Sequence, residues 1–112
     1  MAASDTYIEY DYLILEKLEQ QPDISQRHLA KHLGVSVGKV NYVLAALIER
    51  GLVRATGVKK PNNKAGYRYV LTPQGVSQKA VIARKCLNGK LKEYDQLKAQ
   101  IDTLTRRLLE WE

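Results

Sequence analysis

Residues 25–54 read SQRHLAKHLGVSVGKVNYVLAALIERGLVR, and this stretch decides the fold class. Apolar residues recur at helical spacing on both sides of a short turn, LGVS at 33–36. Gly34 can adopt the left-handed backbone that ends a helix, and Ser25 and Ser36 can each cap the helix that follows them. The pattern predicts a helix-turn-helix, whose second helix has the shape to enter a DNA major groove.

The flanking segments complete a larger pattern. A first helix is expected from about Asp5 to Gln20, and Ile24 after it is long enough only for a bridge-like strand. Two runs rich in β-branched and aromatic residues, 52–56 and 67–71, predict strands joined by a basic, turn-rich tip at 57–66. The apolar residues expected to face the core are Ile8, Tyr12, Leu15 and Leu18 in the first helix, Leu29, Ala30 and Leu33 in the second, and Val40, Val43 or Leu44, Leu47 and Ile48 in the third. Three helices followed by a hairpin is the order of a winged helix, a mainly α fold with a small β-hairpin as its wing.

The C-terminal segment predicts one long helix. Thr72 can cap it, Pro73 suits its first position, and no proline follows before Trp111. Asn88–Gly89 is the weak point where the helix can kink or break, since glycine costs about 1 kcal/mol in a helix interior. Apolar residues recur along this helix at spacings of three and four and form a narrow seam, with a heptad phase shift near the start of the seam. The seam residues are Leu87, Leu91, Tyr94, Leu97, Ile101, Leu104, Leu108 and Trp111.

Such a seam with charged flanks requires a partner. We expect a homodimer through this helix, so that residues 1–72 form a DNA-binding domain and residues 73–112 a coiled-coil-like dimerisation helix. The alternative is a helix that folds back on its own domain.

Charge is distributed unevenly along the chain. Residues 1–24 carry one basic and six acidic side chains, a net charge of −5, whereas residues 25–73 carry nine basic and one acidic, a net of +8. Residues 74–112 carry eight basic and five acidic, a net of +3, within a total of +6. The positive charge therefore lies on the segment with the helix-turn-helix pattern, as neutralisation of phosphates requires.

Other patterns exclude several classes of function. No apolar run reaches the roughly 18 residues of a membrane span, and the start MAASDTYIEYD does not look like a signal peptide. The single cysteine, Cys86, excludes an internal disulfide. A cytoplasmic location is therefore expected. His28 and His32 have the spacing of a metal-binding pair, but nothing nearby completes a site. Cys86 is read as a packing residue rather than a redox switch. No catalytic constellation is recognisable, so we expect neither an enzyme nor a cofactor or metal.

The stretch 25–54, together with YRYVLTPQG at 67–75, resembles the MarR-type winged-helix transcriptional regulators over about residues 8–78. It looks closest to a short subgroup associated with exopolysaccharide gene clusters. The larger members have a longer N-terminal helix, two C-terminal helices and a wing with acids and arginines. Here one C-terminal helix is expected, and the wing carries lysines and asparagines. Whether a small-molecule effector binds is left open.

The resemblance and the helix geometry agree on the residues that would meet DNA. If Val40, Leu44 and Leu47 face the core, the outward residues of the second motif helix, after Ser36, are Gly38, Lys39, Asn41, Tyr42 and Ala45. Ser25, Gln26 and Arg27 begin the preceding helix, where free amides favour a phosphate. The wing would contribute its flanking Arg54 and Arg68 and its tip residues Lys59, Lys60, Asn62, Asn63 and Lys64.

These features predict a homodimeric, sequence-specific DNA-binding regulator, with a repressor favoured over an activator, that binds a pseudo-palindromic operator on double-stranded DNA. Two alternatives stay open. One is a winged helix used for protein docking with a coiled-coil tail, and the other is a weakly specific architectural DNA binder.

Overall fold

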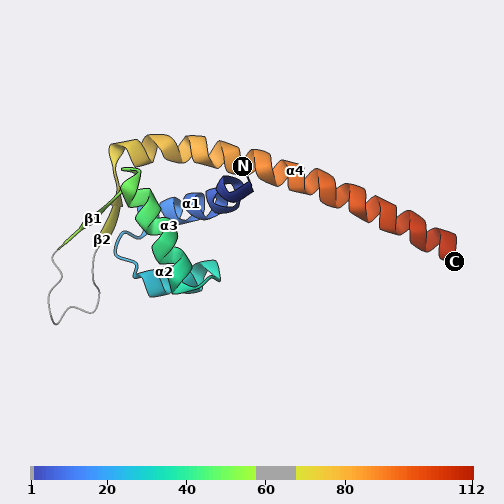
Figure 1. Cartoon of the computed structure of the whole chain (residues 1–112), viewed down its shortest axis with the longest axis horizontal. Coiled ribbons are helices and arrows are strands. Elements are labelled where there is room, and N and C mark those ends of the chain that lie inside the picture. Colours follow the sequence, from blue (N-terminus) through green and yellow to red (C-terminus); the bar gives the residue numbers. More distant parts are fainter. Residues whose placement is uncertain (1, 58–67) are drawn as a thin grey trace.

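The helices and strands occur in the expected order. The computed structural model describes residues 2–57 and 68–112. Its elements are α1 (Ala2–Gln20), α2 (Gln26–Leu33), α3 (Val37–Glu49), β1 (Val53–Thr56), β2 (Arg68–Leu71) and α4 (Pro73–Trp111). Figure 1 shows α1, α2, α3 and the hairpin gathered at one end, from which α4 extends as a long rod. This arrangement confirms the expected winged helix followed by a long C-terminal helix.

Side-chain caps begin α2 and α3 where the sequence predicts them. The hydroxyl of Ser25 accepts from the backbone N–H of His28 at 3.1 Å, and that of Ser36 accepts from the N–H of Lys39 at 3.1 Å. Gly34 ends α2 with a φ of 71°, a left-handed conformation that glycine adopts without strain. The turn between the two motif helices is therefore specified by local chemistry.

The core lies where α1, α2, α3 and the hairpin meet. Its fully buried side chains include Ile14, Leu15, Leu18, Leu29, Val40, Leu44, Leu47 and Val53. Val43 is buried too, so α3 directs both of the alternative residues inward. The expectation for Ile48 was wrong: its side chain is 38% exposed, because it lies at the edge of the α3 apolar stripe.

The segment between α1 and α2 touches the hairpin without becoming a strand. Ile24 is buried, but the sheet contains only β1 and β2 among the described residues. A single backbone hydrogen bond, from the N–H of Tyr69 to the carbonyl of Pro22 at 3.2 Å, joins this segment to β2. The bridge-like strand expected at Ile24 is therefore absent.

The two strands form an antiparallel hairpin. Val53 pairs with Leu71 at one end of the ladder, and Thr56 pairs with Arg68 at the other. The first strand begins one residue later than expected, because the backbone N–H of Leu52 donates to the carbonyl of Leu47 at the end of α3, at 3.0 Å. The tip residues 58–67 lie outside the described residues.

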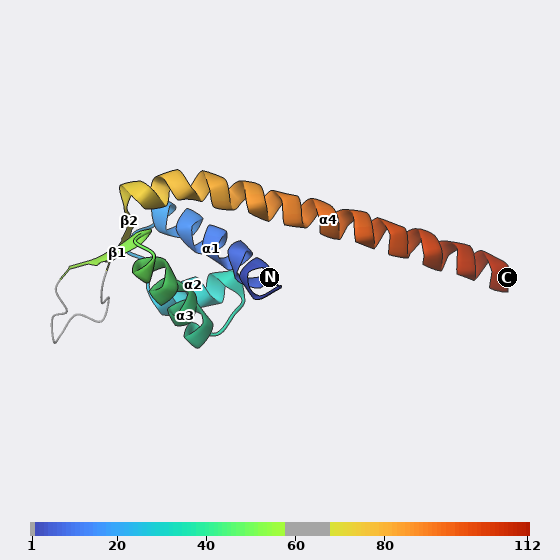
Figure 2. The same ribbon diagram turned by 45° about the horizontal axis from the view of Figure 1, so that its top comes forward.

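A double hydrogen bond at Thr72 begins α4. Its hydroxyl accepts from the N–H of Gly75 at 3.0 Å and donates to the carbonyl of Gly51 at 2.6 Å. The helix then continues unbroken through Asn88–Gly89 to Trp111, as Figure 2 shows, so the break considered for that pair does not occur.

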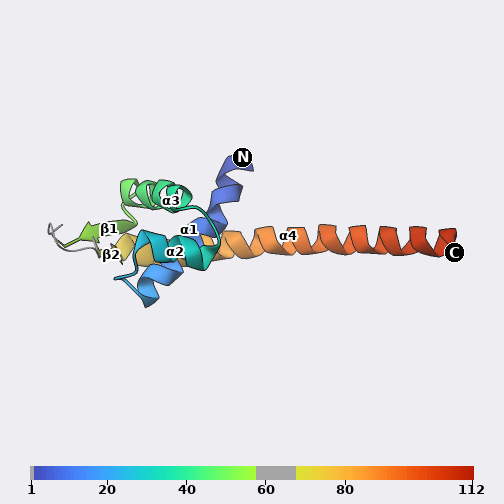
Figure 3. The same ribbon diagram turned by 90° about the horizontal axis from the view of Figure 1, so that it is seen from below.

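The first part of α4 packs against α1, and the rest is uncovered. Ile82 belongs to the same core as the winged helix. Every residue from Leu87 to Glu112 is exposed, including the whole apolar seam. Figure 3 shows this part of α4 extending beyond the other helices. The part of α4 that carries the seam therefore does not fold back on its own domain.

Candidate nucleic-acid interface

The helix α3 has one buried face and one open face. Val40, Val43, Leu44 and Leu47 point into the core, which sets the rotation of the helix. Four of the residues expected to face outward are exposed on the opposite side: Gly38, Asn41, Tyr42 and Ala45. An exposed helix face that combines small residues with hydrogen-bonding side chains has the chemistry needed in a DNA major groove. Contact of these residues with DNA stays a prediction.

Lys39 does not point outward as expected. It is half-buried on the flank of α3, with its ammonium 4.2 Å from the ring centroid of Tyr10 and 5.7 Å from that of Tyr7. The rings attract the ammonium through the negative charge on their faces. Tyr7 also lies against Tyr42, with ring centroids 5.5 Å apart. Two aromatic side chains of α1 therefore hold the flank of the candidate reading helix, a contact that the helical spacing of α3 does not reveal.

The start of α2 lies beside α3 and β2. The amide of Gln26 donates to the hydroxyl of Tyr69 at 3.0 Å, and its oxygen accepts from the amide of Asn41 at 3.2 Å. Ser25 caps the helix and also lies 2.9 Å from Nδ1 of His28. The sequence predicts Gln26 as a phosphate contact, whereas in the structure its side chain joins three elements. Tyr69 was not among the site residues predicted from the sequence, although its place in an alternating strand pattern marks it as inward-facing.

The wing strands carry two exposed cations. Arg54 on β1 pairs with Val70, and Arg68 on β2 pairs with Thr56, so the two arginines lie on adjacent strands of one ladder. The predicted tip contacts Lys59, Lys60, Asn62, Asn63 and Lys64 lie outside the described residues.

Three glutamates of α1 pair with lysines of α4. Lys79 on α4 donates to Glu16 at 2.9 Å and to Glu19 at 2.8 Å. Lys90, further along α4, donates to Glu9 at 2.8 Å. These pairs run from the end of α1 to its start, so they align the two helices antiparallel. The carboxylates of Glu9, Glu16 and Glu19 are thereby directed toward α4.

Two carboxyl groups of α1 have pKa values shifted in opposite directions. Burial raises the pKa of Asp11 above its ordinary value, even though the guanidinium of Arg50 lies 3.0 Å away and opposes that shift. The hydrogen bond from the Tyr12 hydroxyl, followed by that from Lys79, lowers the pKa of Glu16. The surroundings of Asp11 therefore favour its protonated form, whereas those of Glu16 favour its ionised form.

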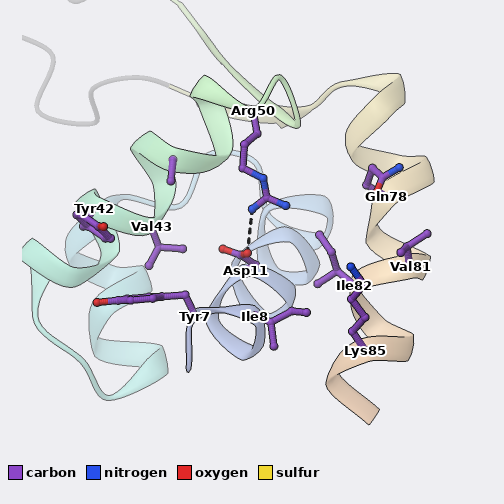
Figure 4. Close-up of a pocket in the computed structure, with 11 residues that line it drawn as sticks. Tyr7, Ile8, Asp11, Tyr42, Val43, Arg50, Gln78, Val81, Ile82 and Lys85 are labelled. Atoms are coloured by element: carbon purple, nitrogen blue, oxygen red, sulfur yellow. Dashed lines mark hydrogen bonds and ion pairs between the residues drawn. The ribbon is translucent and has the colours of Figure 1, made fainter. Parts of the chain in front are cut away.

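A cavity of about 330 Å³ lies between α1, α3 and α4. Figure 4 shows Tyr7, Asp11, Tyr42, Arg50 and Lys85 around it, with the Asp11–Arg50 ion pair crossing its wall. The cavity combines apolar walls with a few polar groups, the general composition of small-molecule sites in proteins. It reaches Tyr42, a residue of the exposed α3 face.

The remaining motifs of the sequence do not assemble into a further site in the described parts of the chain. His28 and His32 are exposed on α2, and no group of three potential metal ligands occurs in residues 2–57 and 68–112. Cys86 is half-buried on α4. No helix in these residues is both long and apolar enough to cross a membrane.

Comparisons with known proteins agree with this geometry. Residues 9–54 match the family of winged helix-turn-helix DNA-binding domains. No curated protein sequence is significantly similar to the chain.

Solved structures of MarR family proteins and of transcriptional regulators resemble the chain. A MarR family protein of Mycobacterium tuberculosis, in complex with p-aminosalicylic acid, is 24% identical with a TM-score of 0.57, over 89% of this chain and 74% of that one. The PcaV transcriptional regulator from Streptomyces coelicolor, with its natural ligand, is 20% identical with a TM-score of 0.62, over 89% and 72% of the two chains. FabT of Streptococcus pneumoniae, in complex with DNA, is 18% identical with a TM-score of 0.55, over 92% and 76%. Residues 9–54 therefore match winged helix-turn-helix DNA-binding domains, and the chain has the fold of the MarR-type regulators.

Proposed function

We propose that this chain is a MarR-type transcriptional regulator that binds a specific DNA operator as a homodimer and acts as a repressor. The observation that carries the proposal is the open face of α3. The core holds this helix from the other side, and the start of α2 lies beside it through the contact of Gln26 with Asn41. The solved complex of the similarly folded FabT with DNA supports it. We assign the chain to the exopolysaccharide-associated subgroup from the overall resemblance of its sequence.

The roles of the residues follow from their positions. Asn41 and Tyr42 face outward, so the amide can pair with adenine and the tyrosine can meet a thymine methyl or a phosphate. Arg54 and Arg68 lie on the wing strands, where they would contact phosphates rather than bases. Lys39 would join them only after leaving the two tyrosine rings of α1.

The binding experiment separates these roles. DNA from upstream of the protein's own gene, and a pool of random duplexes, are titrated with the full chain at several salt concentrations. Asn41→Ala and Tyr42→Ala should each weaken specific binding by about 1–3 kcal/mol. Arg68→Ala should weaken binding to all sequences alike and reduce the salt slope by about 1. An unchanged operator affinity in all three variants would reject the proposed surface.

The same titration distinguishes the alternatives. A protein-docking module would bind neither the upstream DNA nor any duplex of the random pool. An architectural binder would bind both, but competitor DNA would displace it from the operator as readily as from any other sequence. A reporter gene behind the operator then decides the sign of regulation, because a repressor lowers its expression.

The partner that we propose for α4 is a second copy of the same helix. Seven apolar seam residues and a terminal tryptophan stay exposed along this helix, which is roughly 58 Å long at 1.5 Å per residue. From Tyr94 onward the seam fits one heptad register, with Tyr94, Ile101 and Leu108 at the a positions and Leu97, Leu104 and Trp111 at the d positions.

The charges beside this seam favour a parallel pair. In that register Glu93 and Arg107 occupy g positions, and Lys98 and Glu112 occupy the e positions five residues further on. In a parallel coiled coil, each g residue faces the e residue of the following heptad on the other helix, so both combinations attract. A parallel pair also places both winged helices at the same end. Their α3 helices could then meet successive major grooves, about 34–36 Å apart.

The oligomeric state tests this pairing. Light scattering coupled to gel filtration should give the mass of two chains for the wild type and of one chain for Leu104→Glu, which places a charge in the seam. Ala99→Glu is the matched control, because residue 99 lies on the opposite face of α4 and should leave the dimer intact. A monomeric wild type, or a dimer that Leu104→Glu leaves intact, would contradict the assignment.

A small-molecule effector is a second, separable part of the proposal. The cavity between α1, α3 and α4 reaches Tyr42, and Lys85 and Arg50 in its wall suit an aromatic carboxylate such as the p-aminosalicylic acid of the mycobacterial structure. Thermal shift with salicylate-type ligands on the wild type and on Lys85→Met measures this directly. Equal shifts in the two proteins, or none in the wild type, would remove the effector from the proposal.

A further inference from the structure

A chain of two hydrogen bonds connects the core to the open face of α3. The amide nitrogen of Asn41 on α3 donates to the side-chain oxygen of Gln26 on α2 at 3.2 Å. The amide nitrogen of Gln26 donates in turn to the hydroxyl of Tyr69 on β2 at 3.0 Å. Exposure rises along the chain, from the buried Tyr69 through the half-buried Gln26 to the exposed Asn41. The outermost group is the one that would meet a base.

The inner end of this chain is fixed by the fold. Tyr69 pairs with Ala55 in the hairpin ladder, its backbone N–H donates to the carbonyl of Pro22 at 3.2 Å, and its residue is only 9% exposed. A ring held by the ladder and the core cannot move its hydroxyl far. The hydroxyl of Tyr69 therefore stays in place, and in this structure it accepts from the amide nitrogen of Gln26, so that the oxygen of Gln26 faces Asn41.

The consequence for Asn41 is chemical as well as geometric. A free carboxamide can rotate by half a turn and so exchange its oxygen and its nitrogen. The oxygen of Gln26 can accept only from the nitrogen, so it selects one of these two orientations. The oxygen of Asn41 and its second N–H then stay available, and this acceptor–donor pair is the one that the N6 amino group and the N7 atom of adenine require.

We propose that Gln26 and Tyr69 are positioning residues that orient the amide of Asn41 and thereby make one base pair of the operator specific for adenine. The inference deepens the proposed function and rests on it, since Asn41 must meet a base. It assigns Gln26 a role different from the phosphate contact that its place at the start of α2 suggests. It also gives Tyr69 a role in recognition although it is buried away from the open face.

The experiment measures base preference one position at a time. An operator is first selected from random duplexes with the full wild-type chain, and each base pair is then replaced in turn. The base pair at which Asn41→Ala loses its preference is the position read by Asn41. Tyr69→Phe and Gln26→Ala should each reduce discrimination at that position by about 3- to 10-fold, the effect expected from one lost hydrogen bond. Discrimination at the other positions and the salt slope should not change.

Gln26→Glu separates positioning from general loss of binding. A carboxylate still presents an oxygen to Asn41 and can accept from the Tyr69 hydroxyl. Discrimination at the Asn41 position should therefore be retained, while affinity for all sequences falls at low salt because the new charge repels phosphates. Tyr12→Phe and Gln20→Ala are matched controls that remove the same groups from α1, away from this chain of bonds, and should leave discrimination unchanged.

A purely structural role gives a different pattern. If Tyr69→Phe and Gln26→Ala lower affinity for every sequence equally and keep full discrimination at the Asn41 position, the proposal is overturned. It is also overturned if Asn41→Ala alters no base preference. A wild type that selects no DNA would refute the proposed function instead. The link itself then remains measurable, because Tyr69→Phe should shift the side-chain amide NMR signals of Asn41 in the DNA-free protein, and unchanged signals would reject it.

Discussion

Gly75 is the residue whose replacement tests the junction between the winged helix and α4 most directly. It lies buried in the first turn of α4, and a Cβ atom placed on it would overlap the carbonyl oxygen of Leu52 and lie 3.0 Å from the carbonyl carbon. Real Cβ contacts essentially never fall below 3.0 Å. In Gly75→Ala the start of α4 must therefore move away from Leu52 by about 1 Å, a small-to-large change in a packed site.

The magnitude follows from opposing contributions. Alanine favours the helix over glycine by about 1 kcal/mol. Forcing an extra methyl group into a packed site costs about 1–3 kcal/mol. The hydrogen bond from the N–H of Thr72 to the carbonyl of Leu52, now 3.0 Å long, would be strained as well, at a net cost of about 0.5–1.5 kcal/mol if lost. We expect Gly75→Ala to lower the free energy of unfolding by about 1–3 kcal/mol.

Urea unfolding followed by circular dichroism measures this change, at several protein concentrations because dimerisation would contribute to stability. Gly89→Ala is the matched control: it lies in the same helix, nothing lies within 4 Å of the place that its new methyl group would take, and it should raise stability by up to about 1 kcal/mol. The two substitutions should thus have opposite signs. If Gly75→Ala is as stable as Gly89→Ala, the close approach of α4 to Leu52 does not exist in solution.

Three further substitutions test the cap of α4 and the two shifted carboxyl groups. Thr72→Val removes the hydroxyl that caps α4 and should lower the free energy of unfolding by about 1–2 kcal/mol in urea titrations; no change would show that the cap is dispensable. Burial raises the pKa of Asp11 above 3.8, so the ionisation of this group lowers the stability of the fold as pH rises. Asp11→Asn should therefore be more stable than the wild type at neutral pH, and the difference in stability between the two proteins should vanish in acid. Hydrogen bonds from Tyr12 and then Lys79 lower the pKa of Glu16 below 4.5, so the ionised carboxylate stabilises the fold above that pH and this stabilisation is lost in acid. Glu16→Gln should therefore be less stable than the wild type at neutral pH, and the stabilities of the two proteins should converge at low pH. Unfolding titrations from acid to neutral pH check both, and a shared sign for the two variants would contradict the assigned shifts.

Much of the fold was predictable from short-range patterns. The serine caps of α2 and α3, the left-handed Gly34 between them and the threonine cap of α4 all act within three or four residues of the chain, and each was found where expected. The seam of α4 was recognisable for the same reason, since its spacing is a property of one helix. The errors occurred at the edges of such patterns, as with Ile48, where spacing alone does not show which neighbour covers a side chain.

The amino-acid sequence by itself determined the order of the elements, their caps and the face that α3 turns outward, because each depends on residues close together in the chain. Only the tertiary structure decided that Lys39 rests on the tyrosines of α1, and that the acids of α1 meet the lysines of α4. It also brought Gln26 to Tyr69, 43 residues away, and to Asn41, 15 residues away. Such contacts depend on how whole helices and strands pack, and a polar side chain finds its partner only after apolar burial has set those positions.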